Sequence, residues 1–385
     1  MTLKIINLTQ SDYDETLKLL NDVFTIQNKR DMNFEKEMPK IFKNGSKNAE
    51  NHYGIKENGK LVSVLGIYPF DVEIMNERFK FSTVGNIATH PDFCGRGYMN
   101  SLLNFAMDEL SKRGYDASRL GGLRHRYNRV GYEVCGQNYS FEIGSGASVR
   151  GKSEEIKFKK LTSNDKDELV CCMNLNKQYG FFVIRDNPDS EKSVYDTLTT
   201  WRNTPLGAYS KSGEMIGYMC VMPDGKTVSE IRAKDVEAYK NMIFSYQKIM
   251  GEIISFSLPA FDREAVMYFS SVADKFLCIN PCNFKIINFE KVTDALMKLK
   301  LNHFNNLCEG SAVVGIKDYG NIELFFDGYE AGCKKTSKPP FVTLEKLEAH
   351  RYLFGPATAA TVAETNPFLS SWLPLPLSWS ILDSM

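Results

Sequence analysis

The sequence predicts a mixed α+β protein built from more than one domain. Three observations lead to this fold class. The chain has 385 residues, more than one hydrophobic core usually serves. Hydrophobic residues make up 43% of it and charged residues 24%, which is ordinary for a globular protein. Short strand-like apolar runs alternate along the chain with segments of helical periodicity.

The first unit is predicted over residues 1–145. It opens with a strand at Leu3–Ile6 and a helix over Asp12–Phe24, and two hairpin signals then lead into a strand at Ser82–Thr89. The most regular helical pattern of the chain comes next. Its apolar positions form one stripe at Met99, Leu102, Leu103, Ala106, Met107 and Leu110. Further elements are expected at Tyr115–Leu120, Arg124–Arg129 and Tyr132–Cys135.

Two more units are predicted, over residues 155–282 and 283–385. The polar stretch Gly144–Glu155 is interpreted as the first linker, and the Asn280-Pro281 turn as the second boundary. The middle unit repeats the mixed pattern, with a strand at Thr227–Ile231 and a helix at Val236–Met250. The last unit alternates short strands with helices, the first helix being expected at Glu290–Lys300.

Charge and cysteine usage narrow the class of protein. Lys+Arg and Asp+Glu both number 47, so we expect no broad electrostatic grip on nucleic acid or on a membrane surface. No apolar run approaches a membrane span, and the first residues read as neither a signal nor a transit peptide. The nine cysteines contain no CxxC pair, and the five histidines lack metal-ligand spacing beside them. We therefore expect a soluble cytoplasmic protein without a metal.

The segment that carries chemistry is Val84–Met99. Its strand ends at Thr89, and Cys94-Gly95-Arg96-Gly97 then forms a tight turn directly before the regular helix. Glycines let such a turn expose consecutive N–H groups, and the helix start adds partial positive charge, so the element suits a pyrophosphate. The segment has neither GxGxxG nor Gly-Lys-Ser/Thr, which excludes a Rossmann or P-loop interpretation.

This order of strand, proline, Gly-x-Gly turn and helix resembles motif A of the GNAT acetyltransferases, whose turn binds the pyrophosphate of acetyl-CoA. Residues 121–133 (GGLRHRYNRVGYE) also resemble a segment of the enhanced intracellular survival (Eis) group of that family. The residues that match are Tyr127, Arg129, Gly131 and Tyr132. The chain ends after a Leu/Pro/Trp-rich segment, Trp372–Trp379, as Eis-like chains do.

The resemblance implies a fold of tandem GNAT-like mixed sheets flanked by helices, followed by a C-terminal α+β domain like sterol carrier protein 2. It implies an acetyl-CoA-dependent N-acetyltransferase that acts on a primary amine of polyamine-, aminoglycoside- or lysine-like type. Acetyl-CoA would be the co-substrate, and the chain would form a homo-oligomer, frequently a hexamer in that group.

The resemblance also assigns roles to residues. Tyr127 would be the proton donor to the departing thiolate, and the terminal carboxylate of Met385 would be the base. The backbone of Ile87, Ala88 and Thr89 would hold the pantetheine arm. The pyrophosphate would lie on the turn residues, which are Cys94, Gly95, Arg96, Gly97, Tyr98 and Met99.

Three positions depart from the family pattern. Cys94 stands where Arg or Gln usually opens the turn, Met99 where a small residue is common, and Met385 where an aromatic residue is common. Cys94 is the feature that favours the alternative function, a catalytically degenerate protein that binds acyl-CoA or an apolar ligand. As a nucleophile Cys94 lacks a His–Asp/Asn partner set.

Two other side chains allow both a structural and a functional interpretation. His125 is interpreted as a surface or structural histidine rather than the base. Asp22 is either a solvated helix residue or an attractor for a cationic acceptor. In the middle unit the strand at Val228–Arg232 enters the next helix through Asp235 without a glycine pair, so we expect one coenzyme A site per chain.

Overall fold

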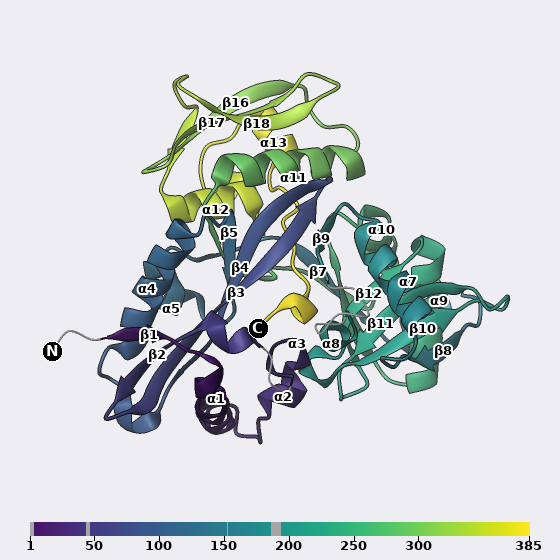
Figure 1. Cartoon of the computed structure of the whole chain (residues 1–385). Helices are drawn as coiled ribbons and strands as arrows, with labels where there is room; N and C mark the ends of the chain where they lie inside the picture. The colour runs from purple at the N-terminus through teal and green to yellow at the C-terminus, as the bar shows by residue number, and fades with distance from the viewer. Residues whose placement is uncertain (1–3, 44–46, 152, 186–193) are drawn as a thin grey trace.

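Three mixed β-sheets with helices packed on them form the molecule, and the chain end lies in the middle of it (Figure 1). The computed structural model describes residues 4–43, 47–151, 153–185 and 194–385. Each sheet contains antiparallel pairs and one parallel pair among the described residues. The predicted mixed α+β class is confirmed.

The first sheet has the strand order β1-β2-β3-β4-β5-β15-β6, with β9 paired to β3. Its strands are β1 (Ile5–Asn7), β2 (His52–Glu57), β3 (Lys60–Ile74), β4 (Glu77–Thr89), β5 (Ala117–Leu120), β6 (Glu133–Cys135), β9 (Phe181–Val183) and β15 (Cys282–Ile286). The helices around it are α1 (Tyr13–Asn28), α2 (Phe34–Glu37), α3 (Pro39–Phe42), α4 (Tyr98–Lys112) and α5 (Arg124–Tyr127). Most of the predicted apolar stripe of α4 is buried, because this face packs on β3 and β4.

The second sheet has the order β14-β7-β13-β12-β11-β10-β8. Its strands are β7 (Asn138–Ile143), β8 (Lys157–Lys160), β10 (Thr204–Tyr209), β11 (Met215–Val221), β12 (Thr227–Ala233), β13 (Ile254–Pro259) and β14 (Lys275–Ile279). Its helices are α6 (Ser145–Arg150), α7 (Lys166–Lys177), α8 (Val194–Leu198), α9 (Val236–Met250) and α10 (Arg263–Val272). Helix α9 has the bounds that the sequence predicts.

The third sheet has the order β18-β17-β16-β19 and lies at the top of Figure 1. It consists of β16 (Gly310–Ile316), β17 (Gly320–Phe326), β18 (Ala331–Thr336) and β19 (Val342–Leu344). The helices of this region are α11 (Phe289–His303), α12 (Lys346–Phe354) and α13 (Pro367–Trp372). Its core is continuous with part of the first sheet, since both belong to one buried cluster.

The sheets do not follow the predicted unit boundaries. Strand β7 lies inside the predicted first unit but joins the second sheet, because Phe141 and Ile143 are buried in that sheet's core. Strand β15 inserts between β5 and β6 of the first sheet. The predicted linker Gly144–Glu155 contains helix α6, so part of this segment is helical. The division into three domains stays a prediction.

His350 ties the first sheet to the C-terminal region. Its Nε2 accepts a hydrogen bond from the N–H of Ile286 at 2.8 Å, so Nδ1 must carry the proton that it donates to the carbonyl of Lys346, 2.6 Å away. Both ring nitrogens are used, and the ring is neutral. Burial lowers the pKa of His350 to about 4.

Acid is therefore expected to weaken the fold through His350. The folded pKa of its imidazole lies below the ordinary value, so the unfolded chain binds the proton first as the pH falls. The free energy of unfolding should drop between about pH 6.5 and about pH 4, by on the order of 1.4 kcal/mol per pH unit. Urea unfolding of the wild type and of His350→Gln across this window should show the extra slope in the wild type alone. Parallel slopes would contradict this role of the ring.

Candidate active site

Strands β4 and β5 separate at the centre of the first sheet. They pair in parallel from Phe81 opposite Ala117 to Val84 opposite Leu120, where β5 ends while β4 continues to Thr89. A bulge bends β4 at this point, with Asn86 at φ 50° and a register shift against β3. The β5 side of residues 85–89 has no strand partner in the described part of the chain. An extended ligand can pair with backbone groups there.

Two adjacent cavities open at this split. The larger, of about 720 Å³, is lined by residues of β4 before and within the bulge, by the chain after β5 and by α1. The smaller, of about 410 Å³, lies over the glycine turn. They share the lining residues Gln27, Ile87, Met99 and Arg126, so a recess leads from the turn to the split strands.

The turn before α4 has the geometry of an anion cradle. Gly95 has φ 81° and Gly97 has φ 82°, which is a backbone conformation that residues with a side chain rarely adopt. No atom lies within 4 Å of the place that a Cβ would take at either glycine, so the space above the turn is open. Gly97 is the N-cap of α4, and the first N–H groups of a helix have no partner within it.

Most of the predicted binding residues come together here. Ile87, Thr89 and five of the six turn residues line the smaller cavity: Cys94, Gly95, Gly97, Tyr98 and Met99. The side chain of Ala88 is instead buried in a neighbouring core. Arg96 does not line the cavity, since its guanidinium pairs with Glu57 at 3.2 Å and covers the ring of Phe93.

Tyr127 faces the larger cavity. It ends the short helix α5, its side chain is 7% exposed, and its ring lies against Gly122, where a Cβ would be 3.1 Å from Cε2. The hydroxyl takes part in no hydrogen bond among the described residues. It is therefore available to a ligand in the cavity.

The chain end lies against the same split. A Cβ added at Gly85 would be 3.1 Å from Cβ of Met385 and 3.6 Å from its carbonyl oxygen. A side chain at position 85 would push one of the two segments away by a few tenths of an ångström, so glycine favours this close approach. Met385 lines the larger cavity together with Tyr127 and also borders two further cavities, of about 270 Å³ and 390 Å³.

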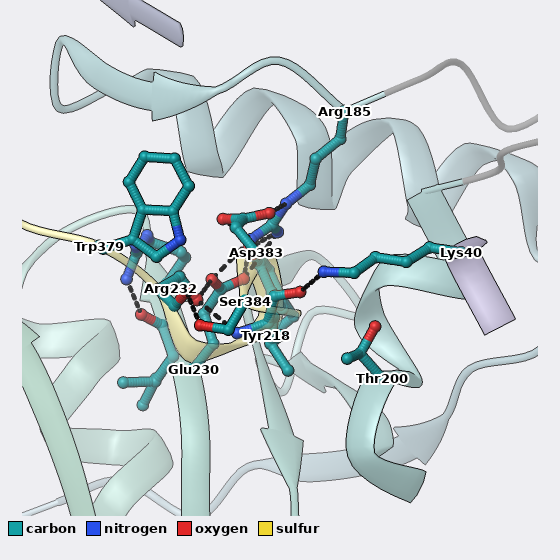
Figure 2. A network of polar contacts seen from close by, with 12 residues as sticks. Lys40, Arg185, Thr200, Tyr218, Glu230, Arg232, Trp379, Asp383 and Ser384 are labelled. Atoms are coloured by element: carbon teal, nitrogen blue, oxygen red, sulfur yellow. Dashed lines mark hydrogen bonds and ion pairs between the residues drawn. The ribbon is translucent and has the colours of Figure 1, made fainter. Parts of the chain in front are cut away.

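A buried ion network holds the chain end in place (Figure 2). The guanidinium of Arg185 donates to both oxygens of Asp383, at 3.1 and 3.0 Å, and to both oxygens of Glu230, at 2.7 Å each. The hydroxyls of Tyr218 and Ser380 also donate to Glu230. Burial alone would raise the pKa of the Glu230 carboxyl, but Arg185 holds it well below its usual range. The last residues are thereby fastened to β12 of the second sheet.

Lys40 adds a contact from the N-terminal region. Its ammonium donates to the carbonyl of Leu382, just before Asp383 in the chain. Burial lowers the pKa of Lys40 to about 7. Segments from the start, the middle and the end of the chain thus meet at this point.

Two residues that line these cavities, Trp201 and Arg126, were not predicted from the sequence. Trp201 lines the larger cavity from the second unit, with φ 60°, a strained value for a side chain of this size. No local pattern marks it. Arg126 lines both cavities, and only the basic run around Tyr127 could have pointed to it.

Asp22 and His125 lie outside both cavities. Asp22 forms an exposed pair with Lys18 at 3.1 Å, as a solvated helix residue does. His125 is exposed on α5. Over the described ranges, no three His, Cys, Asp or Glu side chains are grouped as metal ligands, and no described helix is long and apolar enough to cross a membrane.

Comparison with known proteins agrees with this geometry. Residues 4–135 match the family model of the acetyltransferase (GNAT) domain. No curated protein matches the chain. Among solved structures, a probable N-acyltransferase of unknown function from Enterococcus faecalis is 16% identical, with a TM-score of 0.69 over 98% of this chain and 97% of that one. Eis1 from Mycobacterium abscessus is 11% identical, with a TM-score of 0.64 over 98% of both chains.

The strand split and the glycine turn lie within residues 4–135, the part of the chain that is similar to the acetyltransferase (GNAT) domain. The whole chain, with its three mixed sheets, has the full-length fold of the Eis type. The GNAT family implies an acyl-CoA co-substrate.

Arg185→Met is expected to destabilise the protein strongly. The substitution leaves the carboxylates of Asp383 and Glu230 buried without their shared counter-charge, which costs about 3–5 kcal/mol. Urea unfolding measures the loss, which should shrink at low pH as the carboxylates become protonated. Lys18→Met, which breaks the exposed pair with Asp22, is the control and should change little. Equal stabilities of the two variants would contradict the role given to Arg185.

Proposed function

We propose that this protein transfers the acetyl group of acetyl-CoA to a primary amine. The observation that carries the proposal is the glycine turn at the start of α4, which opens toward the split between β4 and β5, with Tyr127 and the chain end around the same recess. An amine in the larger cavity would then meet a thioester that enters along the open side of β4.

The residues at the recess suit coenzyme A. Its diphosphate needs hydrogen-bond donors and positive potential, and the N–H groups from Gly95 to Met99 at the helix start offer both. Backbone N–H groups would make most of the contacts to the diphosphate. Cys94, in place of the Arg or Gln of the family pattern, therefore removes one charged contact but leaves the geometry of the turn unchanged. Arg126, which borders both cavities, adds charge where Arg96 is engaged by Glu57. The backbone of Ile87 and Thr89 would pair with the pantetheine amides.

The chemistry requires a neutral amine and a protonated leaving group. An alkylammonium has a pKa near 10.4, so a base must take one of its protons, and we assign this role to the carboxylate of Met385, which lines the larger cavity. The amine nitrogen then forms a bond to the acetyl carbon through a tetrahedral intermediate. As the carbon–sulfur bond breaks, the Tyr127 hydroxyl gives its proton to the thiolate, and the second proton released by the former amine nitrogen restores the hydroxyl.

The second unit is proposed to bind no coenzyme A. Helix α9 begins without a glycine pair, and the carboxylate of Asp235 caps it by accepting a hydrogen bond from the N–H of Ala238 at 2.8 Å. A negative side chain therefore occupies the place where a phosphate would lie. One active site per chain follows, and the homo-oligomer stays a prediction.

Gly97→Glu is expected to abolish binding of acetyl-CoA. The new carboxylate would stand in the open space above the turn and repel the diphosphate. Isothermal calorimetry with acetyl-CoA measures the effect. Gly213→Glu is the matched control, because Gly213 also has positive φ (87°) and open space but lies in the hairpin between β10 and β11.

The control should fold and bind like the wild type, while Gly97→Glu should fold with comparable stability and release no heat. Equal binding by both variants would remove the assignment of the turn. Loss of binding in both would show a general cost of glutamate at positive φ rather than a phosphate site.

Tyr127→Phe and a chain that ends at Ser384 are expected to lower turnover more than affinity for acetyl-CoA. Loss of a general acid or base typically costs about 100-fold or more in kcat. Thiol release measures turnover, and calorimetry measures binding. Tyr329→Phe, at a tyrosine that is 93% exposed, is the control. Wild-type turnover in the first two variants would exclude the proposed acid and base.

A further inference from the structure

Hydrogen-bond donors without acceptors gather beneath the C-terminal segment. Arg119, on β5, and Trp379 are only 5% and 4% exposed. Arg119 of β5 lies opposite Thr83 of β4, so both side chains lie on one face of the sheet. Trp379 stacks on Phe81, which also belongs to β4. The enclosed atoms that lack a partner are Thr83 Oγ1, Arg119 Nε and Nη1, Arg232 Nε and Trp379 Nε1.

Three of these residues line one cavity between the first and second sheets. Arg119, Arg232 and Trp379 border the cavity of about 390 Å³. It lies at a second strand split, since β12 and β13 pair in parallel only at Thr227–Ser255 and Val228–Phe256 and then separate. The parting of β4 and β5 at the active site is thus repeated here by β12 and β13.

Among the described residues that line this cavity, the only acidic groups are the Glu230 side chain and the terminal carboxylate of Met385. In the described part of the chain, neither Arg119 nor Arg232 forms an ion pair with a carboxylate. Glu230 attracts Arg232, but the oxygens of Glu230 accept hydrogen bonds from Arg185, Tyr218 and Ser380. A buried guanidinium without a counter-charge is costly, and unpaired donors need acceptors. An anion satisfies both requirements.

The same cavity adjoins the active site. It shares Trp201 and Met385 with the larger catalytic cavity, and the residues that follow Arg119 line that catalytic cavity. The catalytic cavity is bordered by Arg30 and Arg126, and by no Asp or Glu side chain among its described lining residues. A polycation would find there only the terminal carboxylate.

We propose that the cavity of Arg119 and Arg232 binds an acidic group of the acceptor, so that the acceptor is an amine with a carboxylate at its other end. This inference rests on the proposed function and narrows its acceptor. The carboxylate would accept hydrogen bonds from the two guanidinium groups and the Trp379 indole, while the amine reaches Met385 and Tyr127. Polyamine-like and aminoglycoside-like acceptors are then disfavoured.

The test compares acceptors that share an alkyl chain and differ at one end. The probes are 6-aminohexanoate, hexylamine and 1,6-diaminohexane, with 4-aminobutanoate and 8-aminooctanoate to vary the length. Calorimetry without coenzyme A measures binding, and thiol release with acetyl-CoA measures kcat/KM. The best amino acid should exceed the alkylamine of equal length by about tenfold or more in both measurements, with the diamine weakest.

Arg119→Met and Arg232→Met should each remove this preference. Because Arg119→Met replaces a buried guanidinium that forms no ion pair with a carboxylate, it should not lower the unfolding midpoint, whereas loss of a purely structural arginine would. Two variants guard against the failure of one to fold. Arg150→Met, at an exposed pair with Asp274, is the control and should keep the preference.

The outcomes separate the two proposals. Binding of the amino acid that depends on Arg119, without any acetyl transfer, would support the anion site and overturn the proposed enzyme. Transfer to hexylamine and to the amino acid at equal rates would support the enzyme and overturn the anion site. Absence of amino acid binding in the full chain would also overturn the anion site. This result is expected if the terminal carboxylate of Met385 itself occupies the cavity.

Discussion

The contact on which the rest depends is the double fork of Arg185 between Asp383 and Glu230. A guanidinium holds two carboxylates at once only when each is presented edge-on, and both are here. One carboxylate belongs to β12 and the other to the last residues of the chain. The pairing therefore sets the position of the chain end relative to the second sheet, and through Gly85 relative to the first. Met385, which follows this pairing within two residues, lines the larger cavity beside the split strands.

The sequence predicted those features of the candidate site whose residues lie close together in the chain. The glycine turn, the apolar stripe of α4 and the Tyr127 segment each occupy a short stretch, and their backbone requirements are written in adjacent residues. Trp201 and Arg185 gave no such signal. Their roles arise from contacts with residues far along the chain, and an isolated tryptophan or arginine in sequence is compatible with many environments.

The same reasoning explains why two strands join sheets across the predicted unit boundaries. A polar stretch such as Gly144–Glu155 predicts a linker because it carries few apolar side chains, yet Ala147 is fully buried and α6 packs on α9. Strands β7 and β15 read as local continuations of their neighbours in sequence. Their sheet membership depends on which partner edge is free, and a hydrophobic pattern does not encode the partner.

Strand β15 has a consequence for how the protein is made. The slot between β5 and β6 stays empty until residues 282–286 have left the ribosome. Until then the nascent N-terminal sheet presents two unpaired edges, a state prone to wrong pairing. A fragment cut after the family-matched region would keep those edges for good. The first sheet is thus completed late in synthesis, by a strand that follows the last strand of the second sheet in the sequence.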